Sequence, residues 1–154
     1  IYPRLERTME TKLTKADVVN YLEKGIKSVG AWALNIYGES LNQAGEQAFS
    51  EAIEFGIKNT ISALYDAKVN DKEICRVVSE HWGISYQEAE DRLVWEKQQA
   101  TIRALKQYLK LQGYSGIDID SFMRKSNVRI RHEKELWKLK DAPEKLFKAL
   151  QSNN

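Results

Sequence analysis

The feature that most constrains the fold is a pair of helix-start signals that flank one glycine in residues 69–93, VNDKEICRVVSEHWGISYQEAEDRL. Asn70 and Ser85 can each accept a hydrogen bond from a backbone N–H at the start of a helix, and a glutamate follows each of them three residues later. Gly83 lies between them, and glycine commonly ends a helix in a left-handed conformation. The pattern predicts a helix that ends at Trp82, a tight turn, and a second helix directly after Ser85.

Apolar residues recur at helical spacing through most of the remaining chain. In residues 14–37 they alternate in steps of three and four, which is typical of a helix that buries one seam against a partner helix. Residues 46–67 carry a second apolar face, and the helix after Ser85 continues to about residue 112. At 1.5 Å per residue this last helix is roughly 40 Å long, and we expect it to form the spine of the fold.

The last part of the chain predicts shorter elements. Asp118 or Asp120 can cap a short helix. Residues 127–132, NVRIRH, alternate polar and apolar side chains, which favours an extended segment or a lone short strand. A helical turn at residues 133–139 and a last helix that begins at Asp141 follow.

These patterns predict an all-α fold, a single-domain helical bundle of five or six helices with two long helices and a short irregular basic C-terminal segment. The domain should occupy residues 14–154, with residues 1–13 as an N-terminal extension and residues 114–154 as the basic subregion. No apolar run approaches the roughly 20 residues that cross a bilayer, so we expect no membrane partner. Cys75 is the one cysteine, which excludes an intrachain disulfide and fits a reducing, cytoplasmic location.

Chemistry that depends on metals or cofactors has little support in the sequence. The two histidines, His81 and His132, are far apart, and no His-x3-His or Glu-x-x-His pair occurs, so we predict no metal site. No Gly-rich phosphate loop occurs, and we predict no cofactor. Cys75 lies on a predicted apolar helix face and should behave as a small buried hydrophobic residue.

Charge is divided unevenly along the chain. Residues 1–96 carry 11 Lys and Arg against 16 Asp and Glu, whereas residues 97–154 carry 13 against 6. Such asymmetry favours an anionic partner for the basic half. If residues 127–132 are extended, two of their arginines project to one side and could hold phosphate oxygens. The candidate nucleic-acid-binding residues are Arg124, Lys125, Arg129, Arg131, His132, Lys134 and Lys138.

The segment WGIS, residues 82–85, resembles the turn of helix-turn-helix DNA-binding motifs, in which an apolar residue, a glycine, another apolar residue and a serine follow one another. Two features disagree with a DNA-reading unit. Arg92 stands where the second helix should place its third inward apolar residue, with Leu93 one position late. The helix face that would read DNA also carries three carboxylates, Glu88, Glu90 and Asp91. DNA phosphates would repel these negative charges. We therefore interpret the segment as two capped helices joined by a turn.

The string RVVSEH places Arg76 and His81 with four residues between them. This spacing resembles the Arg-x4-His signature of HEPN ribonucleases, which are small helical domains that dimerise to assemble a metal-independent RNA-cleaving site. The resemblance implies that His81 acts on the 2′-hydroxyl and that Arg76 steadies the phosphate. Val77 follows the arginine where the family prefers a polar residue.

Protein binding is a third class of function. Residues 14–37 offer more apolar positions than one partner helix needs, and Trp32 and Tyr37 could form a surface for a protein partner or a second copy of the chain. The acidic first half would suit a basic partner.

The favoured hypothesis is a small, non-catalytic intracellular accessory or regulatory protein that binds nucleic acid through its basic C-terminal surface. The alternative is a protein-binding module, such as an inhibitor or a subunit of a larger complex, of bacterial, phage or mobile-element type. A metal-independent ribonuclease that uses Arg76 and His81 is the second alternative.

Overall fold

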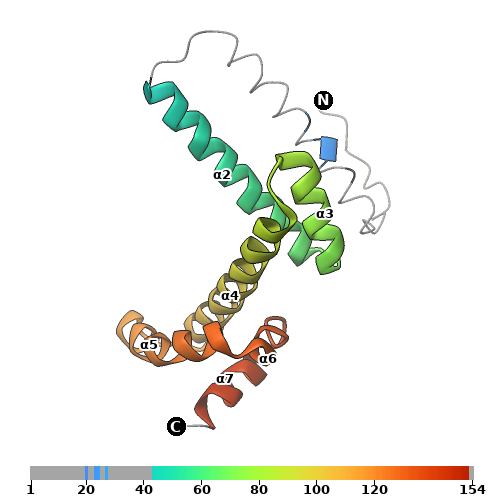
Figure 1. Ribbon diagram of the computed structural model, residues 1–154. Helices are drawn as coiled ribbons and strands as arrows, with labels where there is room; N and C mark the ends of the chain where they lie inside the picture. Colours follow the sequence, from blue (N-terminus) through green and yellow to red (C-terminus); the bar gives the residue numbers. More distant parts are fainter. Residues whose placement is uncertain (1–19, 21–22, 25–26, 28–42, 153–154) are drawn as a thin grey trace, which may run out of the picture.

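The computed structural model describes residues 20, 23–24, 27 and 43–152. Within residues 43–152 the chain forms helices and no strand (Figure 1), so the predicted all-α class is confirmed. The helices are α2 (Gln43–Asp66), α3 (Asp71–Trp82), α4 (Tyr86–Leu111), α5 (Gly116–His132), α6 (Lys134–Trp137) and α7 (Pro143–Gln151). The longest of them are α2, with 24 residues, and α4, with 26.

The capping signals set the bounds of α3 and α4 as predicted. The Asn70 side chain accepts a hydrogen bond from the backbone N–H of Glu73, and the Ser85 hydroxyl accepts one from the backbone N–H of Glu88. Gly83 ends α3 in the left-handed region, with φ of 70°, and its N–H donates to the carbonyl of Ser79. Because side chains are strained at such a φ, glycine suits this turn.

Helix α4 contributes to two separate cores. At 3.6 residues per turn, its buried residues Leu93 and Leu105 point in directions roughly 120° apart around the helix axis. The first core cluster contains Ile57, Ile61, Leu64, Val69, Ile74, Cys75, Val77, Val78, Ala89 and Leu93. The second contains Ile102, Leu105, Leu109, Met123, Ile130, Leu136, Trp137, Leu146 and Leu150. The buried face of α4 therefore changes side in mid-helix.

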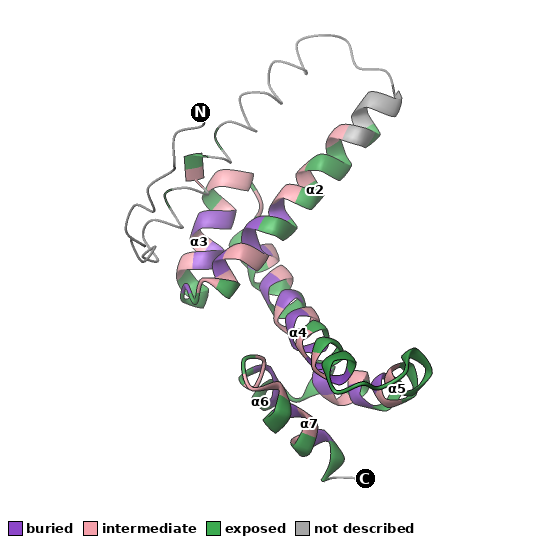
Figure 2. Cartoon of the chain, turned by 180° about the vertical axis from the view of Figure 1, so that it is seen from behind, coloured by how far each residue is buried: buried purple, intermediate pink, exposed green. Residues whose placement is uncertain are grey.

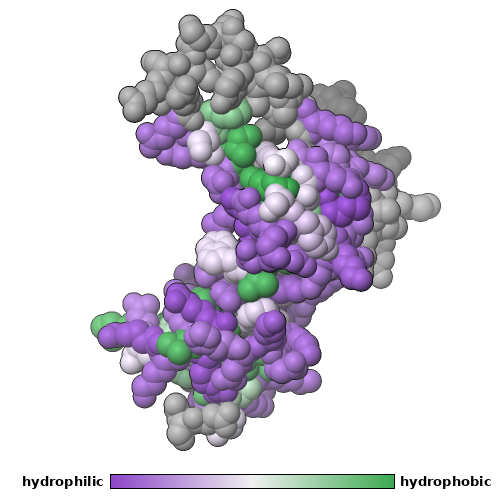
Figure 3. Space-filling model, in the orientation of Figure 1, coloured by the Kyte–Doolittle hydropathy of each residue, from purple (hydrophilic) through white to green (hydrophobic). Residues whose placement is uncertain are grey.

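The change of side divides the described helices into two lobes. The first lobe consists of α2, α3 and the first half of α4; the second consists of the second half of α4 with α5, α6 and α7. Figure 1 shows the two groups at opposite ends of α4, and Figure 2 shows buried residues along the whole of that helix. The space-filling view in Figure 3 is concave between the ends of α2 and α5, and most of that face is hydrophilic.

The prediction of an extended segment at residues 127–132 is wrong, because α5 continues through it to His132. The buried residues Met123, Ser126 and Ile130 are spaced by three and four, so a helix places all of them on one side. A strand would bury alternate residues instead. Tertiary packing on α4 therefore overrides the short alternation, and most of the segment predicted as irregular is helical.

The starts of the last helices also differ from the predictions. Ser115, rather than Asp118 or Asp120, caps α5, and its hydroxyl accepts a hydrogen bond from the backbone N–H of Asp118. The N-cap of α7 is Ala142, and Pro143 takes the first helical position, where its missing N–H has no partner to lose. The helical turn predicted at residues 133–139 is present as α6.

Some predictions fall on residues outside the described part of the chain. These include the extension at residues 1–13, most of the helix predicted over residues 14–37, and the proposed partner surface with Trp32 and Tyr37. Among the described helices, none combines the length and the apolar character needed to span a membrane.

Candidate functional site

Helix α5 presents a basic face away from the core. Met123, Ser126 and Ile130 turn one side of the helix toward α4, so residues on the other side face solvent. Arg124 and Arg131 are seven residues apart and lie on one exposed stripe. This outward stripe is the core of the predicted nucleic-acid surface.

The candidate basic residues differ in whether they already form ion pairs with acidic side chains. The four residues on α5 that are exposed and make no ion pair with a described residue are Arg124, Lys125, Arg131 and His132. Lys134 on α6 is likewise exposed and forms no ion pair within the described residues. Lys138 lies 2.8 Å from both carboxylate oxygens of Glu135, so its charge is already partnered.

Arg129 has a structural role. Its guanidinium donates to both carboxylate oxygens of Glu133, at 2.7 and 2.9 Å, and to the carbonyl oxygens of Ala149 and Leu150, at 3.2 and 3.3 Å. The hydrogen bond from Arg129 lowers the pKa of Glu133. Since the two carbonyls belong to the last turn of α7, Arg129 joins α5 to the C-terminal end of that helix.

Four of the predicted nucleic-acid-binding residues line two different cavities. Lys125 and Arg129 line a cavity of about 380 Å³ with the half-exposed ring of Tyr114. Lys134 and Lys138 line another, of about 480 Å³, that also includes Tyr65 and Trp137. These two cavities share none of the predicted residues, and Arg124, Arg131 and His132 line neither of them.

The aromatic side chains in these cavities differ in availability. Tyr114 packs edge-on against Phe147, with ring centroids 6.0 Å apart, and keeps part of its ring exposed. Trp137 is buried, and its indole N–H donates to the carbonyl of Ile130 at 2.5 Å. Trp137 is thus a core residue, and Tyr114 is the aromatic group that remains accessible beside α5.

The turn between α3 and α4 joins two capped helices, as the sequence predicts. Ala89 and Leu93 are buried, whereas Arg92 lies at the edge of the helix and donates to Glu54 and Glu88. The inward position is taken by Leu93 and not by Arg92, which agrees with the departure from the helix-turn-helix pattern seen in the sequence. The exposed side of this helix start carries Glu90 among other acids, which does not favour contact with phosphates.

Arg76 and His81 do lie near one another on α3, around a shared carboxylate. The Glu23 carboxylate lies 3.7 Å from the Arg76 guanidinium and 3.1 Å from His81 Nε2. Arg76 also binds Glu73 and Glu80, each at 2.5 Å. Three carboxylates thus surround the arginine that the ribonuclease hypothesis would assign to a phosphate.

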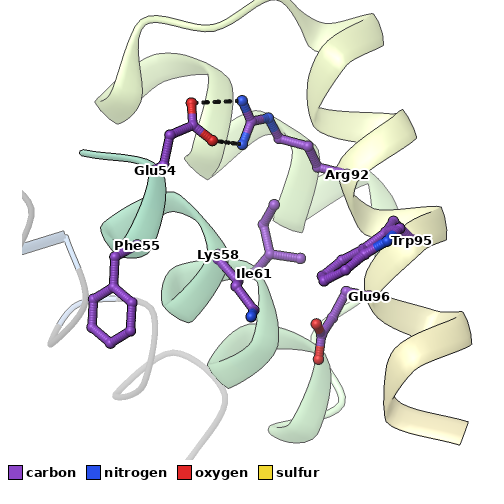
Figure 4. Close-up of a pocket in the computed structure, with 7 residues that line it drawn as sticks. All are labelled: Glu54, Phe55, Lys58, Ile61, Arg92, Trp95 and Glu96. Atoms are coloured by element: carbon purple, nitrogen blue, oxygen red, sulfur yellow. Dashed lines mark hydrogen bonds and ion pairs between the residues drawn. The ribbon is translucent and has the colours of Figure 1, made fainter. Parts of the chain in front are cut away.

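A feature that the sequence did not reveal is a cleft of about 410 Å³ between α2 and α4 (Figure 4). Phe55, Ile61 and Trp95 supply its apolar lining, and Glu96 lies between the two helices. Glu96 is buried three residues after Leu93 in the inward register of α4. In the sequence, the feature that could have indicated this site is a glutamate at an inward position of the helix, since ionised side chains are seldom buried without a partner.

The lone cysteine is part of the first core. Cys75 is buried, as predicted, and burial raises the pKa of its thiol. A buried thiol with a raised pKa has little thiolate and is a poor nucleophile. Within the described residues, no three His, Cys, Asp or Glu side chains gather as ligands for a metal ion.

Comparison of the chain with protein-family models, with curated proteins and with solved structures found no match.

Proposed function

We propose that the chain is a non-catalytic nucleic-acid-binding protein whose contact surface is the exposed side of α5. Arg124, Lys125 and Arg131 supply the positive charge of this surface. The observation that supports the proposal is that none of the three makes an ion pair with a described acidic residue, whereas five other cations of the second lobe do: Arg103, Arg129, Lys138, Lys140 and Lys148.

Unpaired cations suit phosphate binding for a physical reason. A phosphate that approaches Arg124 or Arg131 does not have to displace a carboxylate, and the counterions released from the nucleic acid favour association. Residues 97–154 carry 13 Lys and Arg against 6 Asp and Glu, so the local field attracts a polyanion. The accessible ring of Tyr114 beside Lys125 gives an unpaired base a surface for stacking.

The surface favours backbone contact over the reading of base sequence. Phosphate contacts fix the position of a protein on nucleic acid, whereas base-edge contacts carry sequence information. The exposed residues of α5 include arginine and lysine together with the acids Asp118 and Asp120, and Tyr114, just before the helix, can stack on any base. We therefore expect weak sequence preference and a preference for single strands.

The test is binding of fluorescently labelled single-stranded and double-stranded oligonucleotides across a series of salt concentrations. The triple variant Arg124→Ala, Lys125→Ala, Arg131→Ala should bind more weakly at every salt concentration. It should also reduce the slope of log affinity against log salt by about 2 to 3, because three phosphate contacts are lost.

The matched control removes three exposed lysines from elsewhere in the chain: Lys24→Ala, Lys27→Ala and Lys72→Ala. It loses the same formal charge, so an effect of net charge alone would weaken it equally. Equal weakening of the two triple variants, or an affinity that does not depend on salt, would overturn the proposal.

A further inference from the structure

The cleft between α2 and α4 contains a buried carboxylate oxygen without a hydrogen-bond donor. Glu96 is 2% exposed; its Oε1 lies 2.5 Å from the Arg103 guanidinium, while its Oε2 has no partner in the described part of the chain. Buried polar atoms are almost always hydrogen-bonded, and an unpaired oxygen of a charged group is costly. Glu96 is therefore able to accept one more donor.

The lining of the cleft fits an apolar chain that ends in a positive charge. Phe55 is 66% exposed and Trp95 is 46% exposed, although both are large aromatic residues, and with Ile61 they line the cleft. Figure 4 shows the Trp95 ring directed into the space between α2 and α4, close to Glu96. An aromatic face attracts a cation, and an apolar stem packs well against aromatic side walls.

The chain's own lysine shows that an ammonium group is accommodated here. Lys58 Nζ lies 5.4 Å from the centroid of the Trp95 ring, within the range of a cation–π contact. Lys58 makes no ion pair with a described residue, and its ammonium contacts the Trp95 ring instead. An incoming ammonium would compete with it for the same ring.

The surroundings of the cleft carry more acids than bases. Arg92 at its rim binds both Glu54 and Glu88, and the hydrogen bond from Arg92 lowers the pKa of Glu54, which keeps that carboxyl ionised. The next turns of the two helices add the exposed acids Glu51 and Asp91. A positively charged partner is therefore attracted to this region.

We propose that this cleft binds a lysine side chain that a basic segment of a partner protein presents. The methylene stem packs against Trp95 and Ile61, and the ammonium donates to Glu96 Oε2. Lysine fits better than arginine because one free carboxylate oxygen offers a single acceptor, whereas a guanidinium matches two parallel ones. This site lies in the first lobe and does not depend on nucleic-acid binding by α5.

The experiment titrates the full chain with a short glycine- and serine-flanked peptide that contains one lysine. Binding is followed by the NMR shift of the Trp95 indole N–H, assigned by its loss in Trp95→Leu. The lysine peptide should shift this signal, and peptides with Nε-acetyl-lysine or norleucine at the same position should bind at least about tenfold more weakly, since they lose a charge-assisted hydrogen bond.

Two variants give opposite expected results. Glu96→Gln has nearly the same shape and should lower the affinity for the lysine peptide about tenfold, whereas Lys58→Met removes the competing ammonium and should raise it several-fold. Thermal unfolding of each variant checks that the fold is kept. The α5 triple variant should bind the peptide as the parent chain does.

Equal binding of the lysine and acetyl-lysine peptides would overturn the proposal, as would unchanged affinity in Glu96→Gln with its fold intact. Sedimentation without peptide provides a further test. A dimer that forms in the parent chain and is lost in Glu96→Gln would assign the lysine to a second copy and overturn the assignment to a separate partner.

Discussion

The Lys140 ammonium lies 2.7 Å from a carboxylate oxygen of Asp66 and joins the segment before α7 to the last turn of α2. The same ammonium lies 4.7 Å from the centroid of the Tyr65 ring. Lys68, in the turn that follows α2, contacts Asp141 alongside. The side chain of Lys140 is only 11% exposed, so its interactions are better shielded than those of a surface ion pair. We infer that this contact fixes the two lobes relative to one another.

Replacing Lys140 by methionine should lower the free energy of unfolding by about 1 to 2 kcal/mol, because the Asp66 carboxylate loses its ion pair and the Tyr65 ring loses the nearer of its two cations. The measurement is urea unfolding at neutral pH. Lys138→Met is the control, since Lys138 and its partner Glu135 are both largely exposed and such pairs contribute little. Equal destabilisation by the two variants would contradict a specific role for Lys140.

Gly56→Ala should destabilise the protein, although alanine usually stabilises the interior of a helix. A Cβ atom at residue 56 would lie 2.3 Å from one carbon of the Trp82 indole and 2.9 Å from another. Trp82 cannot move freely, because its indole N–H donates to the Thr60 hydroxyl at 3.2 Å. We expect a loss of about 1 to 3 kcal/mol, typical of overpacking, measured as a lower melting temperature.

The control for this substitution is Gly116→Ala in the first turn of α5. No described heavy atom lies within 4 Å of a Cβ built there. The same chemical change should therefore be neutral or slightly stabilising. If both variants lost stability to the same extent, the contact between α2 and the Trp82 ring would not be the cause.

Much of the first lobe was accessible from the sequence because its signals are local. Asn70, Ser85 and Gly83 act on backbone groups within a few residues of themselves, so their roles do not depend on tertiary packing. The one buried cysteine, Cys75, was equally predictable from the apolar face on which it lies.

The second lobe was less predictable because distant contacts decide its structure. The residues NVRIRH alternate like a strand, but Ile130 is helical since it packs with Leu105 and Leu109 of α4 in one core. The roles of Arg129 and Glu96 were hidden for a related reason. A basic residue within a basic run is expected to be exposed to solvent. Only the packing of α5 against α7 brings Arg129 to the carbonyls at the end of α7.

The stability of the first lobe should fall in acid through the pair of Glu54 and Arg92. Hydrogen bonding to Arg92 lowers the pKa of Glu54 below its ordinary value of 4.5. A carboxyl whose pKa is lower in the folded state stabilises the fold above its unfolded pKa, and this contribution is lost as the pH falls through the folded pKa. Because Glu54 is largely exposed, the loss should stay below about 1 kcal/mol.

The measurement is urea unfolding from about pH 7 to about pH 3 for the parent chain and for Glu54→Gln. The variant should be slightly less stable at neutral pH, and its stability should decline less steeply below pH 4.5. A decline as steep as that of the parent chain would show that other carboxyls account for the acid sensitivity.

Arg129 and Arg131 should behave differently although both belong to the same basic run. Arg129→Ala removes hydrogen bonds to Glu133 and to two carbonyls of α7, so it should lower the free energy of unfolding by about 1 to 3 kcal/mol. Arg131→Ala changes an exposed side chain that makes no ion pair with a described residue, and its effect should lie within about 0.5 kcal/mol. Hydrogen exchange of the amides in α7 should be faster in the first variant alone, since Arg129 holds the end of that helix. If Arg131→Ala weakens nucleic-acid binding while leaving α7 protected, the loss of affinity can be assigned to a lost phosphate contact rather than to a disturbed fold.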